Sequence, residues 1–182
     1  PHLTLSLPSI WHEMQMITPT MNAYGVSFPG APGIIIGFND SIAFGFTNSG
    51  RDVKDYYDIR FKDETKTQYK FDNDWKNADL RIEAIKVKGK PTVYDTVAYT
   101  IFGPVVYDNS FPATEQPGKA LAARWKAHDA SNELLFWHYL DRANNYTDYE
   151  NALQYFTCPA QNVIFASKSD TIAIWQQGDC AV

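Results

Sequence analysis

The chain has 182 residues, a formal net charge of −5 and a pI near 5.3. Hydrophobic residues make up 45% and charged residues 20%, a balance that is typical of globular proteins and excludes a disordered chain. The acidic excess argues against a nucleic-acid partner, because phosphate binding needs clustered Lys and Arg. No apolar run approaches the length of a membrane-spanning helix, so we expect no membrane partner either.

The pattern of apolar residues predicts a chain dominated by β-strands, and an aromatic content of 15% favours the same structure. The expected strands, in chain order, span residues 22–28, 33–38, 41–47, 55–61, 80–87, 92–102 and 119–125, with a short hairpin within 62–76 and a further strand entered at 103–106. The period then changes, and helices are expected from 131–133 to 143 and from 147 to 155. Two last strands, 162–166 and 171–175, form a hairpin. The chain contains no linker or repeat, so we expect a single α+β domain with one helical insertion.

The most informative stretch is residues 29–50, in which two Pro-Gly turns precede three consecutive isoleucines. Such a short β-branched run indicates a buried strand. The next apolar run ends abruptly in Thr47-Asn48-Ser49-Gly50. A small polar cluster at the end of a buried strand is a frequent place for chemistry, because rigid backbone there can aim N–H groups at a ligand.

Both ends of the sequence indicate a piece of a larger precursor. It opens on Pro1 within an apolar–polar alternation and stops directly after a strand-like run. Cys158 and Cys180 flank the last expected hairpin, so a disulfide across its open end is conceivable, and two unrelated free thiols are an equally good interpretation. A metal site built on these two cysteines is not expected.

Four blocks of sequence, taken together and in this order, resemble the β-chain of the penicillin acylase family of N-terminal-nucleophile hydrolases. The blocks are Pro1-His2-Leu3 through Trp11, residues 25–48 with Gly25-Val26-Ser27-Phe28-Pro29-Gly30 at their start, Ala123-Arg124-Trp125 with Leu134-Leu135, and Pro159-Ala160-Gln161-Asn162. The resemblance spans nearly the whole chain. It implies that the chain forms part of a four-layer αββα sandwich, β-dominated and with a helical insertion.

The resemblance also implies an amide hydrolase made as a zymogen. Autocleavage would free a serine nucleophile on the order of twenty residues before Pro1, and its own α-amine would act as general base through a water molecule. The 182 residues lack that serine, so this part of the protein is expected to be inactive alone. The α-chain of the same precursor is the expected protein partner, and the family resemblance suggests a periplasmic or extracellular location.

Three positions match catalytic positions of the family. Asn162 matches the asparagine whose side-chain amide donates to the oxyanion, and Asn48 matches the residue whose backbone N–H supplies the second donor. His2 lies where it would hold the serine or the bridging water. Each also has a plain structural interpretation: an Asn that opens a strand, an Asn in a turn, and a terminal histidine without a role.

Leu3, Ile36 and Phe46 match positions that line the acyl pocket, although they could equally be ordinary core residues. An apolar pocket selects a hydrophobic acyl group, so the expected substrate is a small-molecule amide with an apolar acyl part. Phe46 stands where penicillin G acylase has a small residue, which predicts a pocket of different shape and makes phenylacetyl specificity doubtful.

No cofactor is expected for the chemistry. Asp52, the Lys54 carbonyl and Asp55 match a loop that binds calcium in some members of the family, and carboxylate and carbonyl oxygens suit Ca²⁺. A solvated acidic loop is the other interpretation.

The sequence leaves two further functions open. Exposed Tyr and Trp on a β-face would indicate a non-catalytic module that binds sugars or peptides. A missing upstream serine would indicate a degenerate acylase homologue kept as a structural subunit.

Overall fold

The computed structural model describes residues 6–110 and 118–180. The chain forms two compact units. The first unit ends at Val53 and resumes over Asp129–Cys180, and the second is Lys54–His128. The second unit is therefore an insertion within the first, and it begins directly with a strand.

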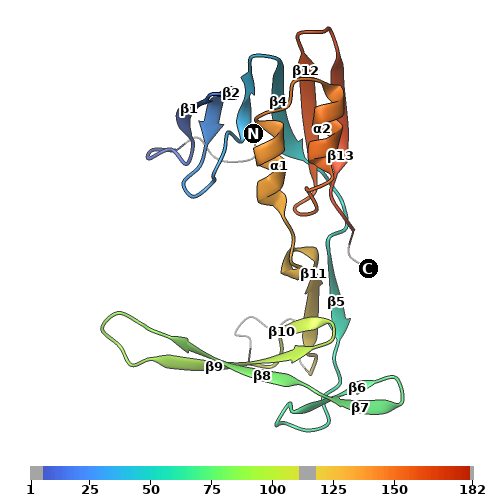
Figure 1. Cartoon of the computed structure of the whole chain (residues 1–182). Helices are drawn as coiled ribbons and strands as arrows, with labels where there is room; N and C mark the ends of the chain where they lie inside the picture. The colour runs from blue at the N-terminus through green and yellow to red at the C-terminus, as the bar shows by residue number, and fades with distance from the viewer. Residues whose placement is uncertain (1–5, 111–117, 181–182) are drawn as a thin grey trace. The chain divides into compact units, whose positions relative to one another are not determined.

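The first unit is built on a six-stranded antiparallel sheet (Figure 1). Its strand order is β1-β2-β3-β4-β12-β13, so the last hairpin of the chain joins the sheet beside β4. The strands are β1(His12–Thr18), β2(Met21–Ser27), β3(Ile36–Asn39), β4(Ile42–Asn48), β12(Gln161–Ser167) and β13(Ile172–Gln177). This topology brings two segments more than a hundred residues apart in sequence into direct hydrogen bonding.

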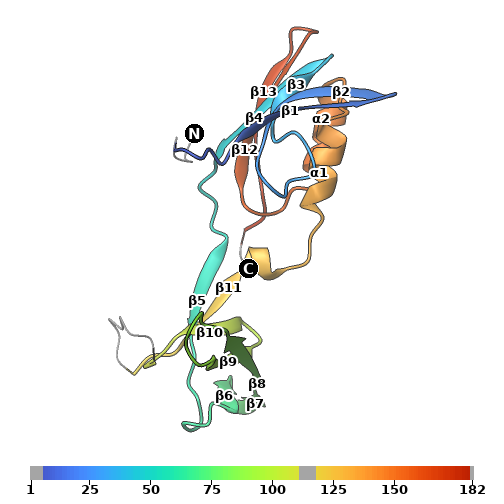
Figure 2. The same cartoon turned by 90° about the vertical axis from the view of Figure 1, so that its left-hand side faces the viewer.

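Two helices, α1(Glu133–Leu140) and α2(Tyr146–Leu153), lie on one side of this sheet (Figure 2). Their buried residues pack on alternate residues of the central strands, and the core contains Ile34, Phe44, Phe136, Leu140, Tyr149, Val163 and Phe165. The Asn145 side chain begins α2 by accepting a hydrogen bond from the backbone N–H of Asp148 at 3.0 Å. The buried Tyr149 hydroxyl donates to the Val163 carbonyl at 2.8 Å, which fastens the helix layer to β12.

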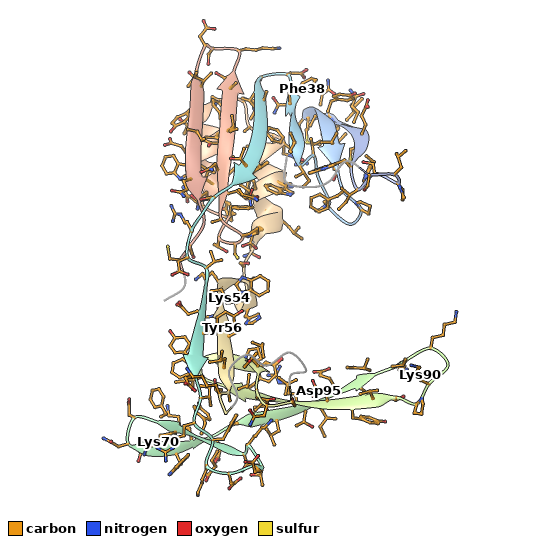
Figure 3. All side chains as sticks on the ribbon, turned by 180° about the vertical axis from the view of Figure 1, so that it is seen from behind. Phe38, Lys54, Tyr56, Lys70, Lys90 and Asp95 are labelled. Atoms are coloured by element: carbon orange, nitrogen blue, oxygen red, sulfur yellow. The ribbon has the colours of Figure 1, made fainter. Side chains whose placement is uncertain are left out.

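The opposite face of the six-stranded sheet carries apolar side chains that remain exposed. Phe38 on β3 is about half exposed (Figure 3) and contacts Tyr24 on β2. Ile164 lies directly opposite Ile174 of β13, and both are also exposed. Within the described residues, this sheet is therefore covered by helices on one face.

The second unit contains a five-stranded sheet of order β5-β11-β10-β9-β8 and a separate hairpin, β6-β7. The strands are β5(Lys54–Asp58), β6(Gln68–Phe71), β7(Asp74–Asn77), β8(Asp79–Ile85), β9(Val93–Thr100), β10(Gly103–Tyr107) and β11(Leu121–Trp125), and a 3-10 helix spans Lys126–His128. Its small core contains Ile59, Tyr69 and Ala122. Lys90 lies at the tip of the β8–β9 hairpin (Figure 3).

The described elements follow the expected order, and several of their bounds differ from the expected ones. The strand expected from residue 33 begins only at Ile36, because side chains hold Gly33 and Ile34: the Ser27 hydroxyl donates to the Gly33 carbonyl at 2.8 Å, and Asp141 accepts from the Ile34 N–H. The Ile35 N–H already donates to the Val26 carbonyl of β2 at 3.0 Å. Strand β1 is absent from the expected elements. It is an edge strand paired with β2 alone and is half-buried only at Met14 and Met16, so its apolar alternation is weak.

Cys158 is half-buried and Cys180 is exposed, and no disulfide joins them in the described part of the chain. Over residues 6–110 and 118–180, no helix has the length and apolar character needed to cross a membrane.

Candidate active site

The two asparagines expected to act together lie at the paired ends of β4 and β12. The register sets Asn162 opposite Thr47 and Gln161 opposite Asn48. The Asn162 side-chain Nδ2 donates to the Asn48 carbonyl oxygen at 3.0 Å and to the Thr47 Oγ1 at 3.1 Å. The fold thus brings together two positions that are 114 residues apart in the sequence.

These contacts have a chemical consequence for oxyanion binding. A primary amide carries two N–H hydrogens, and in Asn162 both are directed at protein oxygens. An oxyanion can accept from this amide only by replacing one of these partners. The Thr47 hydroxyl is the easier one to replace, because a hydroxyl can rotate and find another partner whereas the Asn48 carbonyl is fixed by the sheet.

The chain after Asn48 is tied to the end of β13, which fixes the backbone beside the two asparagines. The Gln176 Nε2 donates to the Ser49 hydroxyl at 2.6 Å, and the Arg51 guanidinium donates to the carbonyl oxygens of Gln176 and Gly178. Charged donors on carbonyl oxygens form strong hydrogen bonds. Rigid backbone is what a backbone N–H donor at this position requires.

An apolar pocket of about 320 Å³ lies beside Asn48, at the same end of the sheet. Ile36 and Phe46, two residues expected in the acyl pocket, both line it. The Phe46 ring lies 5.0 Å from the Trp137 ring and 5.8 Å from the Phe136 ring, so helix α1 forms one wall. The other lining residues are Trp11, Phe28, Ile35, Thr47, Asn48, Glu133, Leu134, Trp137, Phe156, Cys158, Pro159 and Gln161.

Glu133 is the one carboxylate among these lining residues, and the sequence alone marks it only as part of a helix start. Its Oε1 accepts from the Thr157 hydroxyl at 2.5 Å and from the Cys158 backbone N–H at 3.1 Å, and its Oε2 accepts from the Ser131 hydroxyl at 2.5 Å. Partial burial alone would raise the pKa of Glu133, but these hydrogen bonds outweigh it and hold the pKa below its usual value. The carboxylate therefore fixes the segment that leads into β12.

Sequence reasoning also missed the aromatic residues of the pocket. Trp11, Trp137 and Phe156 come from three distant segments, and nothing in their local patterns distinguishes them from core residues. Two other expected site residues, His2 and Leu3, lie outside the described residues.

The residues expected to bind calcium lie at the boundary of the two units. Asp52 is exposed in the first unit, and Lys54 and the half-buried Asp55 begin β5 in the second. The Lys54 ammonium lies 5.2 Å from the ring of Tyr56 (Figure 3). An ammonium has no lone pair, so the backbone carbonyl is the only possible calcium ligand of Lys54. Two carboxylates and a carbonyl suit calcium chemically but supply fewer than the six to eight oxygens it takes. No cluster of three or more His, Cys, Asp or Glu suited to a metal occurs among residues 6–110 and 118–180.

Comparisons with known proteins identify the family of the chain. The family model for penicillin amidase matches residues 1–182. The acyl-homoserine lactone acylase QuiP of Pseudomonas aeruginosa is 29% identical over 177 residues, with 92% of this chain and 21% of that protein covered. The corresponding protein of Pseudomonas fluorescens strain Pf0-1 is 28% identical over 171 residues, with 93% and 21% covered. The chain therefore spans about a fifth of the length of these relatives.

Among solved structures, a thermostable penicillin G acylase from Alcaligenes faecalis superposes with a TM-score of 0.82 at 24% identity, with 94% of this chain and 30% of that chain covered. At this identity the likeness establishes the fold, which is that of an N-terminal-nucleophile hydrolase of the α+β class. The match of the family model over the whole chain establishes the family. The chain belongs to the penicillin amidase family.

Proposed function

We propose that the full-length protein containing this chain hydrolyses a linear amide bond and releases a carboxylic acid and an amine. The nucleophile is a serine that autocleavage exposes upstream of Pro1, and its α-amine is the general base. The observation that carries the proposal is the contact of the Asn162 amide with the carbonyl of Asn48 beside an apolar pocket. The relatives, which are named as acylases, support the same reaction class.

In this mechanism Asn162 and Asn48 stabilise the tetrahedral intermediate. As the serine oxygen bonds to the carbonyl carbon, negative charge develops on the former carbonyl oxygen. The Asn162 Nδ2 turns one N–H from Thr47 toward this oxygen, while its bond to the Asn48 carbonyl keeps the amide in place. The backbone N–H of Asn48 is the second donor. Neutral, fixed donors of this kind contribute roughly 3 kcal/mol each to transition-state stabilisation.

The pocket beside these residues would hold the acyl group. Its wall of aromatic side chains and Ile36 favours an apolar acyl part, while the amine part of the substrate is left to vary. A bulky Phe46 shortens the pocket where a smaller side chain would deepen it. Leu3 and His2 are proposed to complete the pocket and to hold the nucleophile, on the strength of the family resemblance.

The experiment that tests the reaction begins with the full-length protein. Its mature form is examined by N-terminal sequencing and intact mass, and hydrolysis of a panel of N-acyl amides is then measured. A chain that begins at a serine a short way upstream of Pro1 supports the proposal, together with amide hydrolysis that is lost when that serine is replaced. An uncleaved precursor without activity would contradict it and favour a degenerate homologue or a binding module.

Three further points are proposals of the same kind. The α-chain of the precursor is the protein partner, and co-purification of two chains from one gene tests it. A periplasmic or extracellular location follows from the family and is tested by cell fractionation.

Calcium bound by Asp52, the Lys54 carbonyl and Asp55 would have a structural role, and calcium should then raise the thermal midpoint of the full-length protein but not of its Asp52→Asn variant.

A further inference from the structure

Asp141, at the C-terminal end of α1, is a carboxylate buried in the first unit without ionic compensation. Only 2% of its surface is exposed. Its Oδ2 accepts one hydrogen bond, from the backbone N–H of Ile34 at 3.1 Å, and its Oδ1 is buried without a hydrogen-bond partner among the described residues. A buried, half-satisfied carboxylate is costly to keep and therefore calls for an explanation.

The segment that Asp141 holds is the one that leads into the pocket wall. Ile34 is followed directly by Ile35 and Ile36, which both line the apolar pocket. Gly33 is packed so tightly here that a Cβ on it would lie 2.7 Å from the Asp141 Oδ2 and 3.4 Å from the Cβ of Trp137, another lining residue. The carboxylate, the turn and the pocket wall are thus in one continuous set of contacts.

The backbone around Asp141 is itself fixed. The Asn39 side chain donates to the Asp141 carbonyl oxygen at 3.2 Å and to the Ala143 carbonyl oxygen at 2.8 Å. These bonds satisfy carbonyl groups that the end of α1 leaves without helical partners. A movement of the Asp141 side chain would therefore be passed to Ile34 rather than absorbed by the helix end.

We propose that Asp141 is a positioning residue for the acyl pocket, which holds Ile35 and Ile36 in place through the Ile34 N–H and makes ligand affinity depend on pH. The inference rests on the proposed role of the pocket. It assigns to Asp141 no contact with the substrate.

The charges near Asp141 do not neutralise it. Arg142 follows it in sequence, but its guanidinium donates to the carbonyl of His138 at 2.8 Å and contacts the His138 ring. Asp40, from the turn between β3 and β4, lines a polar pocket together with Asp141 and Arg142. Burial raises the pKa of Asp141 to about 6, against the opposing effects of the Ile34 N–H and of Arg142.

The direction of the pH effect follows from the hydrogen bond to Ile34. An ionised carboxylate accepts a stronger hydrogen bond than a neutral acid, so the ionised form of Asp141 holds the Ile34 N–H, and the wall beyond it, more firmly. By linkage, a ligand that needs the ordered wall binds the ionised form more tightly, and affinity rises with the pH through the pKa of Asp141. Asn at this position keeps an oxygen that accepts from Ile34 but cannot ionise.

The test uses the full-length protein and a neutral probe, octanamide, whose binding is measured by calorimetry at pH 5 and pH 7.5. We expect the wild-type affinity to rise on the order of threefold at the higher pH, since only the difference in proton affinity between free and bound states contributes. Asp141→Asn should bind equally well at both values. Asp170→Asn, an exposed turn residue, is the matched control and should follow the wild type.

A second measurement does not depend on the ligand. Hydrogen exchange of the Ile34 amide, compared at one pH, should be faster in Asp141→Ala than in the wild type, and Asp141→Asn should restore slow exchange. The inference is overturned if Asp141→Asn retains the wild-type pH dependence or if Asp141→Ala leaves Ile34 exchange unchanged. If octanamide binds to no form, the acyl-pocket proposal fails, and the exchange data alone decide whether Asp141 fixes the turn.

Discussion

The side-chain amide of Asn162 donates to the backbone carbonyl of Asn48 at 3.0 Å, across the ends of two strands that come from opposite parts of the chain. This contact orients the amide and leaves its second N–H on a hydroxyl, that of Thr47. The amide is therefore held in a position from which one donor can be redirected. This geometry underlies the first prediction.

Asn162→Ala in the full-length protein should lower kcat for amide hydrolysis about 10²- to 10³-fold and change KM little. The reason is that the lost donor acts on charge present only in the transition state. Steady-state kinetics against the best amide substrate of the panel measures both constants. Asn73→Ala, an exposed turn substitution in the second unit, is the control. A kcat within a few-fold of wild type would remove Asn162 from the catalytic machinery.

Phe46→Ala should shift the preference of the enzyme toward bulkier acyl groups. The Phe46 ring contacts Phe136 and Trp137 in the pocket wall, so its removal enlarges the pocket at that point. The same change should destabilise the protein by about 3 kcal/mol, because it removes a partly buried ring from the edge of the hydrophobic core. The ratio of kcat/KM for a long and a short acyl amide is the measurement.

The control for this prediction is Phe38→Ala on the neighbouring strand. Phe38 is half exposed on the opposite face of the sheet and lines a different hollow, so its removal should leave the ratio unchanged. Equal ratios for Phe46→Ala and the wild type would mean that Phe46 is a core residue without a part in specificity.

Much of this fold follows from local pattern. The buried alternation of β4 and β12 and the change of period at Glu133 predict strands and helices that the structure contains. The sequence does not reveal the division into two units, because the inserted segment has the same composition of strands and turns as the rest. It also does not reveal β1, whose edge position demands little apolar alternation.

The candidate site likewise contains residues that can be identified from the sequence and residues that only the structure identifies. Asn48, Asn162, Ile36 and Phe46 could be chosen because their sequence context resembles that of the family. Glu133 and Asp141 could not, because what distinguishes them is burial and hydrogen bonding to segments distant in sequence. A carboxylate at a helix start or end is ordinary in sequence and becomes unusual only when the packing around it is known.

Glu133→Gln should destabilise the first unit by about 1 to 2 kcal/mol and loosen the Thr157–Cys158 segment. The amide keeps one acceptor oxygen, but it replaces charged hydrogen bonds by neutral ones and places a donor toward Ser131 or Thr157. Thermal denaturation near pH 7 measures the loss. Leu135→Gln, in the same first turn of α1 and exposed by 38%, is the control for a Gln at this end of the helix. A Glu133→Gln midpoint equal to that of the control would contradict the anchoring role.

The Glu133 carboxylate should also make the stability of the protein fall as the pH falls, as is usual for an acid that is stabilised in its charged form. Because its pKa is lower in the folded state, Glu133 contributes stability that is present above its unfolded pKa and is lost as the pH falls. Asp108, whose pKa is also lowered despite partial burial because Lys66 and Ser110 donate to it, acts in the same direction. The difference in midpoint between wild type and Glu133→Gln should therefore shrink on acidification below about pH 4.

The ionisation of Asp141 should change folding stability with pH in the direction opposite to that of Glu133 and Asp108. Its folded-state pKa is raised from 3.8 to about 6, so the folded state binds the proton more tightly than the unfolded state. The contribution is present in full below about pH 4 and is lost as the pH rises through about 6, by up to roughly 3 kcal/mol. Asp141→Asn cannot lose a proton, so its stability relative to wild type should increase between pH 4 and pH 7. Thermal midpoints of the two proteins across this range measure the effect. Glu133 and Asp108, whose pKa values are lowered, are present in both proteins, so their contributions cancel in the difference between the two thermal midpoints. A difference that does not change with pH would show that Asp141 ionises as freely as an exposed carboxylate.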